Sequence, residues 1–528
     1  MKQTFPLIIG FLAIAVLTFL SFQAENIKSD SPLKTKKKRP NIIFIMTDDH
    51  TQKAISAYGS QLIQTPNIDR IANEGILFTR SFVTNSICAP SRAVMLTGKY
   101  SHMNGLRDNH DVFDTSQMVF PKLLQKVGYQ TSIVGKWHLK NVPSGFDDWT
   151  ILPDQGHYYN PTFIQNGDTI DYQGYVTDII TDLALGVLEN RDTTKPFCLV
   201  YHQKAPHRNW MPHVKHLSLF NDKDFPLPET FFDDYATRTA AVKEQDMRVE
   251  DMFLSMDMKL QPEFYEKETG TGGHKLHKAV ADWERLYKRL TEEQKKAWDA
   301  HYEKVNYDFK KKNLKGKDLA RWKYQRYIKD YLRCVVSVDE NVGRLLQYLD
   351  ENNLTKNTIV VYTSDQGFYL GEHGWYDKRF MYEETLSTPL IIRYPDEIPT
   401  GQRTNAMVLN LDYAPTFLDY ASSIIPEDIQ GKSLRPICKN EPPEDWRTSI
   451  YYHYYQSTGW HHVPKHCGVR TERHKLIHYY ERDAWEFYDL ENDPNEILNL
   501  YDNREYAEEV SRLKRELKRL KVYYNDES

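Results

Sequence analysis

The chain has 528 residues, and 68 Lys and Arg against 73 Asp and Glu leave a formal net charge of −5. Its 40% of hydrophobic residues and its 5 Cys exclude a disordered chain, a polytopic membrane protein and a disulfide scaffold. A pI near 6.5 excludes a globally basic nucleic-acid binder. We therefore expect a large soluble globular protein with no nucleic-acid partner.

The first 39 residues have the composition of a targeting segment and a linker. Lys2 precedes an apolar run, Phe5–Phe22, which predicts a secretory signal peptide over residues 1–24. Phe22 fits the small-residue cleavage pattern poorly, so an uncleaved N-terminal anchor stays an alternative. Residues 25–39 are interpreted as a basic linker. We expect an exported protein, periplasmic or secreted, with no membrane span beyond this signal.

From Pro40 onward, apolar runs alternate with helical patterns. Continuous apolar runs are typical of strands buried on both faces of a sheet, and they predict strands at Asn41–Met46, Thr131–Val134, Phe197–Tyr201, Thr358–Tyr362 and Pro389–Tyr394. Helices are predicted at Ile68–Glu74, Met118–Val127, Val176–Leu188 and Leu332–Leu349. This alternation predicts an α/β fold with a doubly wound sheet that contains several parallel strands.

Two regions depart from this alternation. Residues from about 215 to 326 are highly charged and helix-prone, as in Trp283–Tyr302, and are interpreted as a helical insertion with a solvated face. Beyond Arg435 we expect a terminal helix, Glu508–Lys521, preceded by short aromatic strands at Ser449–Tyr455, Cys467–Arg473 and Lys475–Tyr480. We therefore predict a catalytic domain over residues 40–435, which carries the insertion, and a C-terminal α+β subdomain over residues 436–528.

Polar residues with oxygen ligands follow two of the predicted strands. Asp48 and Asp49 come directly after the first strand, and Asp365 and Gln366 follow Thr358–Tyr362. Open α/β sheets place their ligands at the carboxyl ends of the strands, where such oxygens can converge on one hard cation. Oxygen ligands suit both Ca²⁺ and Mg²⁺, and we expect Ca²⁺ in preference to Mg²⁺.

The segment Ser86–Gly98 reads S-I-C-A-P-S-R-A-V-M-L-T-G. It resembles the C-x-P-S-R…T-G signature of the type I sulfatases of the alkaline-phosphatase superfamily. The resemblance implies a mixed α/β sheet sandwiched by helices, with a smaller C-terminal α+β subdomain. It also implies that a sulfatase-maturating enzyme oxidises Cys88 to formylglycine, and that the metal is bound by Asp48, Asp49, Cys88, Asp365 and Gln366.

Three further segments match the same family: G-K-W-H at 135–138, K-A-P-H at 204–207, and G-E-H-G at 371–374 with a following Lys at 378. They carry over four catalytic positions, Lys136, His138, His207 and Lys378. The chain departs from the most frequent pattern at Gln366, where many members have Asn. A Gln side chain still offers a carbonyl oxygen to a metal.

A sulfate ester needs a cation and fixed positive donors, because its negative charge is spread over several oxygens. The resemblance implies that hydrated formylglycine at position 88 supplies the nucleophile, while Lys136 and Lys378 hold the sulfate. Asp365 would accept the proton of the nucleophile, and Arg92 would hold the diol. The alcohol would be protonated by His207, and the final elimination would use His138 as its base.

The segments Gly156–Pro161 and Lys204–Pro212 most resemble those of the N-acetylglucosamine-6-sulfatase group. This implies 6-O-desulfation of N-acetylglucosamine in sulfated oligosaccharides of the heparan or heparin type. We expect sugar contacts from Lys204, His461 and His462, and from aromatic side chains with polar tips: Tyr158, Tyr159, Trp210, Trp375 and Trp460.

Two alternatives stay open at the level of sequence. One is another hydrolase of the same superfamily: an iduronate-2-sulfatase, an arylsulfatase or a phosphonate monoester hydrolase. The other is a non-catalytic glycan-binding protein in which Cys88 is never converted. Assays on sulfated and phosphorylated esters separate the first, and mass spectrometry across Cys88 decides the second.

Overall fold

The computed structural model describes Met1 and residues 38–268, 270, 276–456 and 461–527. The predicted signal peptide beyond Met1, most of the basic linker, and Trp460 lie outside these residues. Pro40–Ser528 forms one compact unit. None of the helices in the described ranges is long and apolar enough to cross a membrane.

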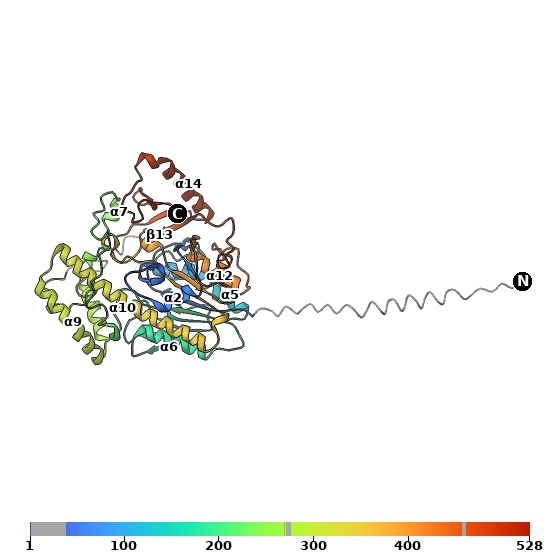
Figure 1. The fold of residues 1–528 in the computed structure, drawn as a ribbon, viewed down its shortest axis with the longest axis horizontal. Helices are drawn as coiled ribbons and strands as arrows, with labels where there is room; N and C mark the ends of the chain where they lie inside the picture. Colours follow the sequence, from blue (N-terminus) through green and yellow to red (C-terminus); the bar gives the residue numbers. More distant parts are fainter. Residues whose placement is uncertain (2–37, 269, 271–275, 457–460, 528) are drawn as a thin grey trace. The chain divides into compact units, whose positions relative to one another are not determined.

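A ten-stranded mixed sheet forms the centre of this unit, in the order β11-β2-β10-β9-β1-β8-β4-β5-β6-β7 (Figure 1). Its four central strands pair in parallel: β9 (Thr358–Ser364), β1 (Asn41–Thr47), β8 (Phe197–His202) and β4 (Gln130–Lys136). β10 (Leu390–Arg393) runs antiparallel to β9, which makes the sheet mixed. The remaining strands are β2 (Ile76–Phe78), β5 (Asp148–Leu152), β6 (Thr162–Gln165), β7 (Asp168–Asp171) and β11 (Gln402–Thr404). The predicted α/β fold and its five strands are confirmed.

Helices cover both faces of the sheet because successive side chains of a strand point to opposite faces. Ile43 and Ile45 of β1 share a core with α2 (Pro66–Asn73), α6 (Val176–Glu189) and α10 (Gly316–Glu351). Ile42 and Phe44 share a second core with α3 (Cys88–Thr97), α5 (Phe120–Lys126) and α12 (Tyr413–Tyr420). In Figure 1, α6 and α10 lie side by side along one face.

The helical insertion differs from its prediction in two ways. The stretch Trp283–Tyr302 is two helices, α8 (Leu276–Lys288) and α9 (Glu292–Lys312). The second helix begins at a capping box, in which the Thr291 side chain accepts from the Gln294 N–H and the Gln294 side chain accepts from the Thr291 N–H. The predicted Leu332–Leu349 helix is the C-terminal half of the 36-residue α10. The predicted end of the insertion, at about residue 326, therefore lies within this helix and not at a boundary between elements.

The C-terminal region is a four-stranded antiparallel sheet covered by α14 (Ala507–Tyr523). Its strands are β13 (Ser449–Tyr454), β14 (His466–Thr471), β15 (His474–Tyr479) and β16 (Ala484–Asp489). Three of these strands and the helix are confirmed, whereas β16 was not predicted as a strand. The sheet shares a hydrophobic core with Phe82, Ile87 and Val94, so it packs on the segment that carries α3.

Short elements complete the chain: β3 (Ser81–Phe82), β12 (Val408–Leu409), α4 (Ser101–Asn104), α7 (Ala240–Lys243), α11 (Glu383–Leu386) and α13 (Arg435–Cys438). All five cysteines are buried free thiols.

Candidate active site

The ends of β1 and β9 bring three carboxylates together. The parallel register places Thr47 opposite Ser364, so the residues that follow both strands leave the sheet at the same edge. Asp48, Asp49 and Asp365 are fully buried, and their oxygens lie within 4.8 Å of one another. The Asp49 N–H donates to Asp365 Oδ1 at 3.1 Å, which connects the two strand ends directly.

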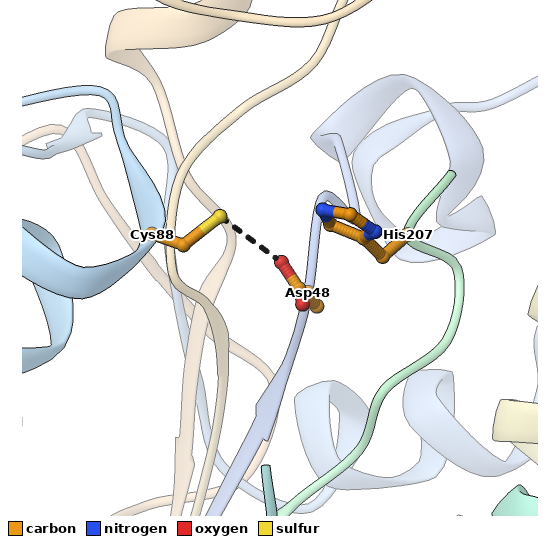
Figure 2. A group of neighbouring side chains, drawn as sticks. All are labelled: Asp48, Cys88 and His207. Atoms are coloured by element: carbon orange, nitrogen blue, oxygen red, sulfur yellow. Dashed lines mark hydrogen bonds between the residues drawn. The ribbon is translucent and has the colours of Figure 1, made fainter. Parts of the chain in front are cut away.

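Cys88 is the first residue of α3 and points at this acidic cluster. Its Sγ lies 3.5 Å from Asp48 Oδ1. Figure 2 shows the three elements that meet here: Cys88 comes from the helix, Asp48 from the end of β1, and His207 from a loop. Burial raises the pKa of the Cys88 thiol to about 12, so the unmodified thiol stays protonated at neutral pH and is a poor nucleophile. The N-terminus of a helix favours negative charge, which suits an anionic substrate at this position.

Arg92 lies one turn after Cys88 on the same face of α3. Its Nε and Nη2 donate to Asp365 Oδ2 at 3.1 and 2.9 Å, and its Nη1 donates to the Lys136 carbonyl at 2.9 Å. The guanidinium therefore holds the ends of β9 and β4 against the helix that carries Cys88.

Lys136 ends β4 and reaches the cluster from the other side of β1. Gly135 has a φ of +110°, and a Cβ at this position would lie 1.8 Å from the His202 carbonyl oxygen, so only glycine fits between β4 and β8. The Lys136 Nζ donates to the Asp48 carboxylate and, at 2.5 Å, to Gln155 Oε1. Gln155 was not predicted as a site residue.

Lys378 and Gln366 both contact Asp49. The Lys378 Nζ donates to the two carboxylate oxygens of Asp49 at 2.6 and 2.7 Å. Gln366 Nε2 donates to Asp49 Oδ1 at 2.5 Å. Gln366 Oε1 is buried and accepts no hydrogen bond from any described residue. A buried oxygen of this kind is available to a metal ion.

The pKa values of the three carboxylates show how crowded they are. Burial, reinforced by the neighbouring carboxylates, raises the pKa of Asp49 to about 7 and that of Asp365 to about 6. Burial acts on Asp48 in the same direction, but the charges of Lys136, His207, Arg92 and Lys378 hold its pKa well below the usual value. A divalent cation would relieve this crowding, and the three carboxylates with the Gln366 oxygen are the hard ligands that it prefers. The residues present therefore fit such a cation.

Two histidines border the cluster. His138 Nε2 lies 3.1 Å from Gln155 Nε2, and His207 Nε2 lies 3.8 Å from Asp49 Oδ2. His207 Nδ1 donates to the Arg208 carbonyl at 2.6 Å. Burial lowers the pKa of both imidazoles well below the usual value, so both are neutral at pH 7.

A cavity of about 710 Å³ opens onto the cluster and is lined by six of the predicted site residues. Its lining includes Cys88, His138, Lys204, His207, Lys378 and His461. His461 is buried, with Nε2 at 3.3 Å from Asp377 Oδ2. His462 exposes 61% of its side chain, pairs with Asp246 at 3.3 Å, and does not line the cavity within the described chain.

The prediction of aromatic sugar contacts is wrong for all four of the predicted residues that the structure describes. Tyr158, Tyr159, Trp210 and Trp375 are at most 2% exposed, and none of them lines the cavity among the residues described. The hydroxyls of Tyr158 and Tyr159 donate to the carbonyls of His207 and Pro212. These two side chains therefore hold the backbone of the loop that carries His207 and do not face the cavity. Their apolar area is buried in the core, which outweighs what exposure to a sugar could offer.

The cavity wall also contains residues that sequence analysis missed. Asp377 and Arg379 flank Lys378, and Arg379 Nε lies 3.2 Å from Asp377 Oδ1. Lys278, Asp282 and Arg285 come from α8, at the i, i+4, i+7 spacing that places them on one helix face. Lys278 and Arg285 are exposed, so the predicted solvated face is confirmed here, and this part of it also borders the cavity. The spacing was the available signal, but a solvated face has the same spacing.

Known proteins resemble this chain over nearly its whole length. A family model described as sulfatase matches residues 40–423, and one described as N-sulphoglucosamine sulphohydrolase, C-terminal, matches residues 371–523. The N-acetylglucosamine-6-O-sulfatase of Bacteroides thetaiotaomicron is 51% identical over 502 residues, covering 94% of this chain and 88% of the relative. A solved structure in complex with its substrate, D-glucosamine-2-N,6-O-disulfate, has 51% identity and a TM-score of 0.89, covering 93% of this chain and 99% of the other. The human N-acetylglucosamine-6-sulfatase is 25% identical over 444 residues, covering 79% of this chain and 67% of the relative.

Proposed function

The chain belongs to the sulfatase family of sulfuric ester hydrolases, and from this premise we propose that it removes the 6-O-sulfate from N-acetylglucosamine-type sugars of heparan or heparin chains. The observation that carries the proposal is the position of Cys88. Its Sγ lies 3.5 Å from Asp48 at a cavity that Lys204, His207 and Lys378 also line. The 51% identical relative is named for this sulfate position, and the similar structure contains a 6-O-sulfated glucosamine.

Cys88 is proposed to be oxidised to formylglycine by a sulfatase-maturating enzyme, because the motif C-A-P-S-R begins at this residue. A hydrated aldehyde at position 88 would supply an oxygen nucleophile and a second hydroxyl for later elimination, which a thiol cannot provide. Mass spectrometry of the peptide that contains Cys88 tests the conversion. An unmodified thiol throughout native material would overturn the conversion. If that material also hydrolyses no sulfate ester, the glycan-binding alternative would be favoured.

The side chains around Cys88 are proposed to have separate roles in the hydrolysis. Lys136 and Lys378 bind sulfate oxygens, since both ammonium groups are buried and adjacent to Cys88. His207, neutral in the free protein, takes up a proton from solvent when the anionic sulfate is bound, because negative charge nearby favours the imidazolium, and donates that proton to the departing alcohol. His138 accepts the proton in the final elimination. Arg92 keeps Asp365 oriented through the two hydrogen bonds that it makes to Oδ2, so that Asp365 can accept the first proton.

We propose Ca²⁺ in preference to Mg²⁺ as the cation, held by Asp48, Asp49, Asp365 and Gln366, with position 88 in reach. A bound divalent cation would supply positive charge next to the ester oxygens. Elemental analysis of purified protein, followed by dialysis against a chelator and addition of each metal, tests this choice. Full activity restored by Mg²⁺ alone would overturn it.

Desulfation of a defined panel tests the substrate. The panel contains N-acetylglucosamine-6-sulfate, galactosamine-6-sulfate, iduronate-2-sulfate, an aryl sulfate and an aryl phosphonate monoester. We expect the first to have the highest kcat/KM. Preference for the iduronate sulfate, the aryl sulfate or the aryl phosphonate would replace the proposed activity with the corresponding alternative in the same superfamily. Preference for galactosamine-6-sulfate would overturn the proposed sugar.

Export to the periplasm or the medium is proposed from the predicted signal peptide at residues 1–24. Cell fractionation with N-terminal sequencing of the mature protein tests this. Recovery in the cytoplasm with an intact N-terminus would contradict it, whereas recovery in the membrane fraction would favour the uncleaved anchor.

A further inference from the structure

Lys204 is a buried cation that faces the active-site cavity. The residue is 3% exposed and lines the cavity. Its Nζ lies 4.8 Å from the centre of the Tyr158 ring, but it makes no hydrogen bond or ion pair with any residue that the structure describes. Burial, followed by the charge of Lys136, lowers the pKa of Lys204 to about 8. A buried ammonium without a carboxylate is costly, and an anion entering the cavity would relieve that cost.

Other basic groups converge on the same end of the cavity. His157 follows β5 and Arg285 lies on α8, and both line the cavity. Burial lowers the pKa of His157 to about 3. The next largest causes are the positive charges of Arg289, Lys204 and Arg285, so each of these three groups lies close enough to His157 to disfavour its protonation. Arg289 is held in place by the carbonyls of Tyr159 and Asn160.

The acidic residues of the cavity do not neutralise this end. Asp377 is engaged by Arg379 at 3.2 Å and by His461 at 3.3 Å. Asp154 lies 3.6 Å from His138 and is 82% exposed. Asp282 pairs with Arg285 at 3.3 Å, on a wall that also carries Lys278. Lys204 therefore keeps a net positive charge on the side of the cavity that faces α8.

We propose that Lys204, His157 and Arg285 form a second anion subsite, which binds an anionic group of the substrate other than the sulfate that is hydrolysed. This inference rests on the proposed function, because that substrate class offers such a group. Two sources have the same chemistry: an N-sulfate on the same glucosamine, and the carboxylate of a neighbouring uronate. Lys204 and Arg285 supply charge, and the neutral His157 supplies an N–H donor.

Three substrates separate these sources: N-acetylglucosamine-6-sulfate, glucosamine-2-N,6-O-disulfate, and N-acetylglucosamine-6-sulfate linked to a uronate. We expect the wild-type kcat/KM to be higher for a substrate with the second anion than for the first substrate. This preference should fall about tenfold in Lys204→Met and about threefold in the more exposed Arg285→Gln. The loss should appear in KM, and added salt should weaken the wild-type preference more than that of either variant.

Arg321→Gln is the matched control. Arg321 lies on α10, is half exposed and pairs with Asp318 three residues earlier, as Arg285 pairs with Asp282, but it does not line the cavity within the described residues. This variant should keep the wild-type preference. A wild-type enzyme that treats all three substrates alike, or variants that keep its preference, would overturn the subsite.

A binding measurement keeps the subsite testable without turnover. Glucosamine-N-sulfate, which has no ester at O6, is titrated calorimetrically into wild-type protein and into Arg285→Gln, with uncharged N-acetylglucosamine as the reference ligand. We expect tighter binding of the N-sulfate to wild type and loss of that advantage in the variant. Equal binding of both ligands to wild type overturns the N-sulfate source. If the enzyme hydrolyses no 6-O-sulfate yet binds the N-sulfate as expected, the proposed function fails and the subsite stands.

Discussion

The two ends of the active-site cavity are built in different ways. At the inner end, Asp48, Asp49 and Asp365 are fully buried and emerge from adjacent parallel strands. At the outer end, α8 contributes side chains such as Arg285, which is 59% exposed and makes one ion pair at 3.3 Å. The inner residues are positioned by sheet register, whereas the outer ones are positioned by a helix inserted between β8 and α10.

This difference separates the chemistry from the choice of substrate. A change at the inner end disturbs groups that also hold β1, β4 and β9 together, as Arg92 does through Asp365 and the Lys136 carbonyl. A change on α8 alters exposed side chains without touching the sheet. Reaction type should therefore depend on the sheet, and sugar preference should depend on the insertion.

The largest effect is expected at Cys88. Cys88→Ala removes the group that we propose is converted to the nucleophile, so kcat should fall by at least about 10³-fold. Cys438→Ala is the control, since Cys438 is also a buried free thiol but does not line the cavity in the described structure. Steady-state rates on the preferred sulfated sugar measure both. Substantial turnover by Cys88→Ala would break the assignment of the chemistry to the inner end.

Removal of the cation should have the next largest effect. Without a bound cation, burial and mutual repulsion raise the pKa values of Asp49 and Asp365. A divalent cation offsets this repulsion, and its removal therefore leaves the charged carboxylates unfavourably close together. Chelation should reduce kcat by about 10²-fold or more, and it should lower Tm because ligand binding stabilises the folded state. Re-addition of Ca²⁺ should restore both. Activity that survives exhaustive chelation, with metal content verified as zero, would contradict a catalytic cation.

The inner end was largely predictable from sequence, for a physical reason. A strand buried on both faces must be apolar throughout, so β1 and β9 are visible as continuous runs, and the polar residues that follow them must lie at the sheet edge. The motif around Cys88 then placed one more side chain at that edge. Gln155 was missed because it matches no motif and follows β5 in a loop. Only the folded path of this loop brings its side chain to Lys136.

The outer end was not predictable in the same way. Charged residues on α8 have the same spacing whether they face solvent or a cavity, and only tertiary packing decides between the two. Tyr158 shows the opposite error, since an aromatic ring with a polar tip suits both a sugar and a core in which its hydroxyl finds a carbonyl. β16 was missed although Phe487 and Tyr488 are apolar, because Ala484–Asp489 also contains Glu486, which is buried and accepts from Thr239.

A buried ion pair connects the two ends, and its loss should have an intermediate effect. Arg208, next to His207, donates to Asp257 Oδ1 at 2.7 Å and to Oδ2 at 2.8 Å. Asp257 belongs to the insertion and also accepts from the Phe253 N–H at 2.9 Å. Asp257→Asn leaves a buried guanidinium facing a neutral amide, so the free energy of unfolding should fall by about 3–5 kcal/mol. Asp282→Asn, in the exposed pair with Arg285, should cost less than about 1 kcal/mol.

The same pair predicts a pH dependence with a definite sign. Burial acts to raise the pKa of Asp257, but the charge and hydrogen bonds of Arg208 lower it below its usual value of 3.8. Since the folded pKa is lower than the unfolded one, the stabilisation is complete above about pH 4 and is lost as the pH falls through the folded pKa. Denaturant unfolding should therefore show a constant gap between wild type and Asp257→Asn from pH 7 to 5, and a narrowing gap toward pH 3. A gap that widens on acidification would contradict an ionised Asp257.

The smallest effect on activity is expected for a substitution of His462, whereas a larger effect is expected for the neighbouring His461. His461 is 1% exposed and lines the cavity, whereas His462 exposes 61% of its side chain and contacts Asp246 outside the lining residues that the structure describes. His462→Ala should change kcat/KM by about twofold or less, because an exposed pair of this kind contributes little. His461→Ala should raise KM by about tenfold, since it removes a buried partner of Asp377 at the cavity wall. Equal effects at the two positions would show that access to the cavity does not decide which of these side chains affects sugar binding.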